Sequence, residues 1–216
     1  TLDIWITIPE GLRAEEIAAI LKEKLSEYDD SWVTELKKNE GYLFPDTYLI
    51  PQTASLEDVL AILDRTFNQK ITEAGLSLDD PALNKILTIA SLIEREALFD
   101  DDQHLISSVI HNRLEIDMPL QIDATVQYAL GFSKSEGKWW RKNLTREDLQ
   151  TKSLYNTYEK TGLPPGPIAS PGIQSIEAAK NPEQSDYLFY IHDAKGRAHF
   201  AQDLEGHNKN IEKYLK

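Results

Sequence analysis

The clearest pattern of apolar and polar positions lies between residues 83 and 97. Apolar side chains recur there at the three- and four-residue spacing of one helix face, and further apolar residues lie on the opposite side. Asp80 and Pro81 precede the pattern, and both residue types are typical of a helix start. The pattern therefore predicts a central helix that is buried nearly all round. Its apolar positions are Leu83, Ile86, Leu87, Ile89, Ala90, Leu92, Ile93 and Ala97.

Shorter patterns predict the elements on either side of this helix. They indicate a strand at 2–8, helices at 14–25, 55–75, 103–116, 124–130 and 171–180, a hairpin from 187–192 and 198–202, and a C-terminal amphipathic helix. Residues 153–172 are rich in proline and glycine, which predicts a stiff irregular loop. The expected fold class is α+β, mainly helical, with a C-terminal β-hairpin and a small N-terminal αβ remnant.

Composition narrows the class of protein. A chain of 216 residues can bury one good core plus a small appendage. Its formal net charge of −13 disfavours a nucleic acid as partner. The sequence contains no apolar run of membrane-spanning length and no signal peptide. Because it starts inside a predicted strand, we expect a fragment whose N-terminus has been removed. The absence of cysteine fits an extracytoplasmic location without establishing it.

Two carboxylates, Glu94 and Glu96, lie near the end of the predicted central helix. Helical geometry places them about 200° apart, so they face different surroundings. A carboxylate among apolar groups has a raised pKa and can act as a general acid near neutral pH. The alternative interpretation is that both glutamates pair with arginines or lie at the solvated helix end. Periodicity alone leaves the two interpretations open.

Other polar clusters have ordinary structural explanations. The three carboxylates at 100–102 fit the start of a helix better than a metal site. His192, His199 and His207 lack the spacing of a helical zinc site, so we predict no metal. Asp123 can cap the helix that follows it or contact a substrate, and Arg113 can clamp Glu94 or contact a substrate.

Four blocks of sequence resemble the YceG/MltG family of endolytic murein transglycosylases. They are EGYLFPDTY at 40–48, ASLIEREA at 90–97, HNRLEIDMPLQIDATVQYAL at 111–130 and SLYNTYEKTGLPPGPIASPG at 153–172. The resemblance implies a lysozyme-like catalytic domain over residues 40–216. Residues 1–39 correspond to the end of a LysM-like accessory subdomain and a linker. Ala97 stands where lysozyme-like transglycosylases usually have Ser or Thr, so no hydroxyl is available there.

The same resemblance implies roles for individual residues. Glu96 corresponds to the catalytic acid and base. The implied supporting residues are Glu94, Asn112 and Arg113. The implied substrate-binding residues are Glu40, Tyr42, Gln121, Asp123, Thr125, Tyr155, Asn156, Thr157 and Tyr158. For the aromatic members of this set, packing against the core remains an alternative. Trp139 and Trp140 lie in a predicted surface loop, and two interpretations stay open for them: a platform on which glycan stacks, or a cover over the core.

The function implied by the resemblance is cleavage of peptidoglycan glycan strands between N-acetylmuramic acid and N-acetylglucosamine, with 1,6-anhydro products and no cofactor. The partners expected are glycan strands and cell-wall synthesis proteins. The location expected is the extracytoplasmic face of the cell membrane, through an anchor that this sequence lacks. Two alternatives remain: a hydrolase that pairs Glu96 with Glu40 or Asp123, and a non-catalytic glycan-binding module.

Overall fold

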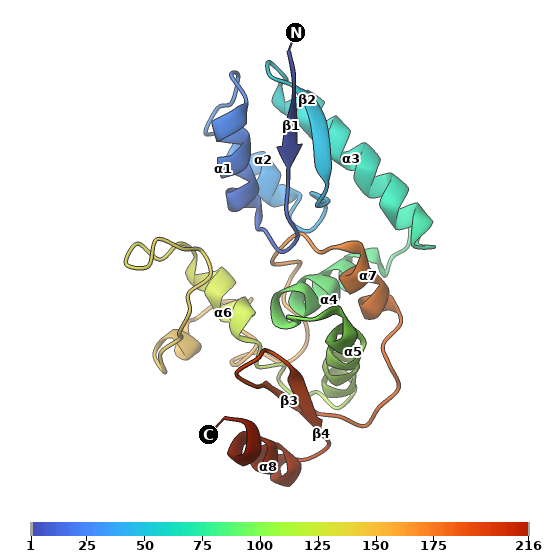
Figure 1. Cartoon of the computed structure of the whole chain (residues 1–216), viewed down its shortest axis with the longest axis vertical. Helices are drawn as coiled ribbons and strands as arrows, with labels where there is room; N and C mark the ends of the chain where they lie inside the picture. The colour runs from blue at the N-terminus through green and yellow to red at the C-terminus, as the bar shows by residue number, and fades with distance from the viewer. Residues whose placement is uncertain (1, 216) are drawn as a thin grey trace.

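The computed structural model describes residues 2–215, which form a mainly helical α+β fold (Figure 1). The helices are α1 (Ala14–Lys24), α2 (Trp32–Lys38), α3 (Leu56–Glu73), α4 (Leu83–Glu96), α5 (Asp100–Glu115), α6 (Asp123–Leu130), α7 (Ile173–Lys180) and α8 (Leu204–Tyr214), with a short 3₁₀ helix at Asp148–Gln150. The strands are β1 (Asp3–Thr7), β2 (Thr47–Pro51), β3 (Phe189–His192) and β4 (Ala198–Ala201). The strands form two antiparallel pairs, one near each end of the chain.

The first hydrophobic cluster lies at the N-terminal end of the molecule. Strand β1 pairs with β2 in a register that sets Ile6 opposite Tyr48, and the inward side chains of both strands pack on α1 and α2. The same cluster includes Val59 and Leu63 from the first half of α3. Strand β2 lies after residue 40 in the sequence, yet its buried side chains belong to this N-terminal cluster. The predicted domain boundary between residues 39 and 40 stays a prediction.

The second cluster surrounds α4, as the apolar pattern predicted. Leu87 and Ile93 are 0% exposed, which confirms that the helix is buried through most of its length. It contacts α5, α6 and α7. Phe67 and Ile71, from the second half of α3, also belong to this cluster. One helix of 18 residues thus contributes to both clusters.

The starts of α3 and α4 show that local capping rules hold for one helix and fail for the other. Helix α3 starts with a capping box of the kind that Ser55 and Asp58 favour by their spacing, since Ser55 Oγ accepts a hydrogen bond from the Asp58 amide at 3.2 Å. The cap predicted for α4 is wrong: the helix begins at Leu83, and Asp80 instead accepts a hydrogen bond from the Ala82 amide at 2.8 Å. Ala82 already has helical backbone angles, so the Asp80 side chain closes the preceding turn.

The C-terminal hairpin is confirmed. Strands β3 and β4 pair with Tyr190 opposite Phe200, and α8 packs against both strands. Figure 1 shows the hairpin below α4 and α5, at the end of the molecule away from β1 and β2. Within residues 2–215, no helix combines the length and the hydrophobicity needed to cross a membrane.

Replacing Leu87 by alanine tests the role of the central helix. Leu87 is fully buried, so Leu87→Ala should lower the free energy of unfolding by about 3 kcal/mol. Chemical denaturation measures the change. Leu78→Ala is the control, because that side chain is 44% exposed and its loss should cost much less. Equal effects of the two substitutions would contradict the assignment of α4 as the centre of the core.

Candidate active site

A polar pocket of about 270 Å³ lies beside the C-terminal end of α4. Its lining comes from α4, α5, α6, β3 and the loops that precede α6 and follow the 3₁₀ helix. The lining residues are Glu96, Arg113, Leu120, Gln121, Asp123, Tyr158, Tyr190, Ile191 and His192. Segments far apart in the sequence therefore meet at one helix end.

Glu96 is the last residue of α4 and is partly buried. Tyr190, on β3, donates a hydrogen bond from its hydroxyl to Glu96 Oε2 at 2.9 Å. Burial raises the pKa of Glu96 to about 7, and the negative charge of Asp123 acts in the same direction. The Tyr190 hydrogen bond and the charge of Arg95 oppose this rise. A carboxyl group with such a pKa can both donate and accept a proton near neutral pH.

Asp123 is a second carboxylate in the pocket, and it does not cap α6. The helix has Ile122 at its N-cap and no side-chain cap bond. Asp123 Oδ1 instead accepts a hydrogen bond from the Tyr158 hydroxyl at 2.6 Å. The interpretation of Asp123 as a helix cap is therefore wrong, because its carboxylate is hydrogen-bonded to Tyr158, 35 residues further along the chain, and lines the pocket.

Arg113 lines the pocket but does not clamp Glu94. Its Nε donates to the Leu188 carbonyl at 2.6 Å, and its Nη1 donates to the carbonyls of Leu120 at 2.7 Å and Pro119 at 3.2 Å. The predicted pairing with Glu94 is wrong. These bonds join the loop before α6 to the start of the hairpin, so Arg113 fixes two sides of the pocket relative to each other.

Gln121 lies at the rim of the pocket with its side chain exposed. Its backbone has a φ of 52°, in the left-handed region that side chains other than glycine rarely adopt. The amide of Gln121 donates to the Thr157 carbonyl at 3.1 Å, which holds this conformation. Backbone strain of this kind often accompanies functional positions. The exposed carboxamide can offer both a donor and an acceptor to a polar ligand.

Glu94 faces the N-terminus of α7 instead of the pocket. Its Oε2 accepts hydrogen bonds from the Gly172 amide at 3.0 Å and the Ser175 hydroxyl at 2.8 Å. A carboxylate at this position stabilises the positive end of the helix dipole. The two glutamates of the 90–97 block therefore have different surroundings, as their angular separation predicted.

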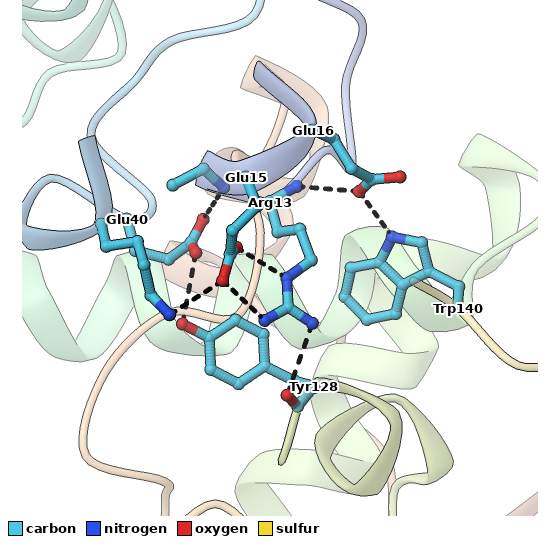
Figure 2. A network of polar contacts seen from close by, with 8 residues as sticks. Arg13, Glu15, Glu16, Glu40, Tyr128 and Trp140 are labelled. Carbon is cyan, nitrogen blue, oxygen red and sulfur yellow. Dashed lines mark hydrogen bonds and ion pairs between the residues drawn. The ribbon is translucent and has the colours of Figure 1, made fainter. Parts of the chain in front are cut away.

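Glu40 lies outside the pocket, in the polar network of Figure 2. One carboxylate oxygen accepts from the Ala14 amide at 3.0 Å and the other accepts from the Tyr128 hydroxyl at 3.2 Å. Burial and the neighbouring charge of Glu15 raise the pKa of Glu40 to about 8. The network joins the start of α1 to α6.

The remaining predicted substrate-binding residues also lie outside the pocket lining. Thr125 and Thr157 are buried and bonded to each other at 2.9 Å. The buried Asn156 donates to the carbonyls of Leu149 and Thr151. The other two are aromatic: Tyr42 packs on Phe67 and Tyr155 packs on Tyr128. The supporting residue Asn112 donates to the carbonyls of Ser185 and Tyr187.

Tyr190 and His192 line the pocket, although neither was predicted as a substrate-binding or catalytic residue. They lie two residues apart on β3, so they share one face of the predicted hairpin. Burial lowers the pKa of His192, and its Nε2 is buried without a hydrogen-bond partner. The sequence showed that side chains alternate between the two faces of this strand. Nothing local indicated that the face with Tyr190 and His192 packs on the end of α4. No cluster of potential metal ligands occurs within residues 2–215.

Comparison of the chain with known proteins identifies the family to which it belongs. A protonatable carboxylate in a polar pocket is typical of enzymes that act on polar substrates by acid–base chemistry. The chain matches the YceG-like family over residues 2–213 and belongs to that family.

Three relatives illustrate the similarity. The endolytic murein transglycosylase of Bacillus subtilis (strain 168) is 37% identical over 241 residues, which cover 97% of this chain and 65% of that protein. The enzyme of the same name from Streptococcus pneumoniae (strain ATCC BAA-255 / R6) is 35% identical, covering 82% of this chain and 32% of that protein. The 2.6 Å crystal structure of a yceG-like protein from Listeria monocytogenes matches with a TM-score of 0.75 at 33% identity, covering 95% of this chain and 75% of that chain. The chain thus spans less than two thirds of both transglycosylases.

The contacts of Glu94 predict a role in stability. Glu94→Gln keeps the shape but removes the charge at the N-terminus of α7, so the free energy of unfolding should fall by about 1 kcal/mol. Thermal and denaturant unfolding measure the loss. Glu23→Gln is the control, because the Glu23 side chain is 74% exposed and should contribute little. An unchanged stability of Glu94→Gln would contradict the assigned role.

Proposed function

We propose that this chain is an endolytic lytic transglycosylase that cleaves the bond between N-acetylmuramic acid and N-acetylglucosamine in peptidoglycan. The observation that carries the proposal is the environment of Glu96. This carboxyl group lines a polar pocket, burial raises its pKa to about 7, and Tyr190 orients it. Membership in the YceG-like family, and the names of the similar proteins, supply the reaction class and the substrate.

In the proposed mechanism, Glu96 performs both proton transfers. Its carboxyl group donates a proton to the glycosidic oxygen, the bond to the anomeric carbon breaks, and positive charge develops on the muramic acid. The resulting carboxylate accepts the proton of that sugar's C6 hydroxyl as the C6 oxygen attacks the anomeric carbon. The nucleophile belongs to the substrate, so the attack is intramolecular and needs no bound water. Glu96 ends the cycle protonated again, and no cofactor takes part.

The pocket residues around Glu96 have consistent proposed roles. Gln121 and Asp123 offer hydrogen-bonding groups to the sugars, and Tyr158 orients Asp123. We retain Glu40, Tyr42 and Tyr155 as proposals for parts of a longer glycan path. The contacts of Thr125, Asn156 and Thr157 favour a role in holding the loops in place.

The wider context follows from the same family membership. We propose a lysozyme-like catalytic domain over residues 40–216 and the end of a LysM-like subdomain over 1–39. The proposed substrate is the glycan strand of peptidoglycan, which supports a location at the extracytoplasmic face of the membrane. Cell-wall synthesis proteins are the partners expected there.

Replacing Glu96 by glutamine tests the proposal. Glu96→Gln keeps the side-chain shape and removes the transferable proton, so glycan cleavage should fall by about four orders of magnitude or more. Mass spectrometry of digested glycan strands measures the release of anhydro-ended products. The melting temperature should stay close to that of the unchanged protein.

The matched control for this experiment is Glu94→Gln, two residues earlier on the same helix. It should keep cleavage per folded molecule, because Glu94 bonds to α7 and does not line the pocket. An active Glu96→Gln beside a folded but inactive Glu94→Gln would reverse the assignment. Intact glycan after treatment with the unchanged protein would favour the non-catalytic binding module.

A hydrolytic glycosidase is the second candidate, and one observation favours it. Asp123 shares the pocket with Glu96, whereas Glu40 lies in a separate network. A hydrolase would use Asp123 to activate water and would leave reducing ends.

Product analysis with Asp123→Asn separates the two candidates. For the transglycosylase we expect anhydro ends from both proteins and a loss of about ten- to a hundred-fold in rate, because only a polar contact is weakened. Asp117→Asn, outside the pocket lining, should cleave at the unchanged rate. Reducing ends from the unchanged protein, together with an inactive Asp123→Asn, would establish the hydrolase instead.

A further inference from the structure

Arg95 lies between the two glutamates of α4 but pairs with neither. None of the ion pairs formed by residues 2–215 includes it. Its guanidinium is partly buried, and its Nε is buried without a hydrogen-bond partner. Burial lowers the pKa of Arg95, although an arginine remains charged in proteins. A desolvated cation normally takes a nearby carboxylate, so the position of this side chain requires an explanation.

The guanidinium is held by the N-terminal part of the chain. Arg95 Nη1 donates to the Gly11 carbonyl at 3.2 Å. A Cβ atom at position 11 would lie 3.1 Å from that Nη1, and Gly11 has a φ of +73°, so glycine suits this contact on both counts. The guanidinium carbon also lies 3.9 Å from the ring centroid of Trp140. Planar stacking of this kind stabilises an arginine without neutralising it.

Trp140 is itself fixed by α1. Its indole nitrogen donates to Glu16 Oε2 at 2.8 Å, and the Arg13 amide donates to the same oxygen at 3.2 Å (Figure 2). The stacking surface for Arg95 is therefore anchored at the N-terminus of α1. Through these contacts the N-terminal elements reach a side chain adjacent in sequence to Glu96.

We propose that Arg95 is a positioning residue: its anchorage on Gly11 and Trp140 keeps its positive charge away from Glu96, so that Glu96 retains the proton it donates. The proposal rests on the proposed role of Glu96. Gly11 and the N-terminus of α1 would then help to set the protonation state of Glu96, through their contacts with Arg95 and Trp140.

The charged and titratable groups around both side chains support this role. Facing Glu96 are Asp123 on α6, Tyr158 on its loop, Tyr190 and His192 on β3, and Arg113 on α5. Facing Arg95 are Glu16 on α1 and Glu94 and Glu96 on its own helix. Arg113 donates hydrogen bonds to three backbone carbonyls, which restrain its position. Arg95 is therefore the cation whose placement depends on the N-terminal elements.

Two kinds of substitution should shift the titration of Glu96 in opposite directions. Arg95→Gln removes the cation and should raise the pKa of Glu96. Trp140→Leu keeps the cation but removes its stacking surface, so Arg95 can approach Glu96 and should lower that pKa by about one unit. The double variant should behave like Arg95→Gln. A purely structural role would not produce shifts of opposite sign.

The measurement is an NMR titration of the protein with ¹³C-labelled glutamate carboxyl groups, with Glu96→Gln to assign the signal. The basic limb of the pH–activity profile should move in the same direction as the titration. Trp139→Leu is the matched control, because Trp139 stacks on Arg13 instead of Arg95 and its loss should leave the titration unchanged. If Trp140→Leu does not fold, Arg95→Lys replaces it, since an ammonium group stacks less well and should also lower the pKa.

Shifts of the same sign, or no shift, in Arg95→Gln and the variant with the weakened anchor would overturn the proposal. A shift in Trp139→Leu equal to that in Trp140→Leu would overturn it as well. These outcomes are separate from failure of the proposed function, which would show as the absence of anhydro-ended products from the unchanged protein. The NMR titration does not depend on activity.

Discussion

The site depends on how the last turn of α4 is held. Three consecutive charged residues leave this turn in three directions, and each meets a different part of the chain. Glu94 bonds to the N-terminus of α7, Arg95 bonds to Gly11, and Glu96 accepts from Tyr190 on the hairpin. A helix end is ordinarily the part of a helix that frays most readily. Here contacts from three sides oppose fraying around Glu96, the residue to which we assign the proton transfers.

The central helix was predictable because the apolar periodicity that indicates it lies entirely within residues 83–97. Periodicity alone predicted a buried helix, and the angle between Glu94 and Glu96 predicted their different surroundings. The capping box at Ser55 was predictable for the same reason, since both partners lie within four residues. Local rules failed at Asp123, where a tyrosine from a distant loop competes with the helix amides for the carboxylate.

The membership of the pocket was only partly predictable. The resemblance supplied Glu96, Gln121, Asp123 and Tyr158, all of which line the pocket. It could not separate these from neighbours such as Thr157, because a block of sequence mixes side chains that face the pocket with side chains that hold it together. Tyr190 was missed because its contact with Glu96 spans 94 residues, and no local pattern encodes such a contact.

The backbone of Gln121 has a consequence for attempts to make this protein more stable. Relief of left-handed strain by glycine is a common stabilising substitution, and strain of this kind costs about 1–2 kcal/mol. At this position the same change would remove the carboxamide from the pocket rim. On the proposed role of Gln121 in binding the sugars, selection for heat resistance and selection for turnover would favour different residues at position 121, and thermostability at this rim would be gained at the expense of catalysis.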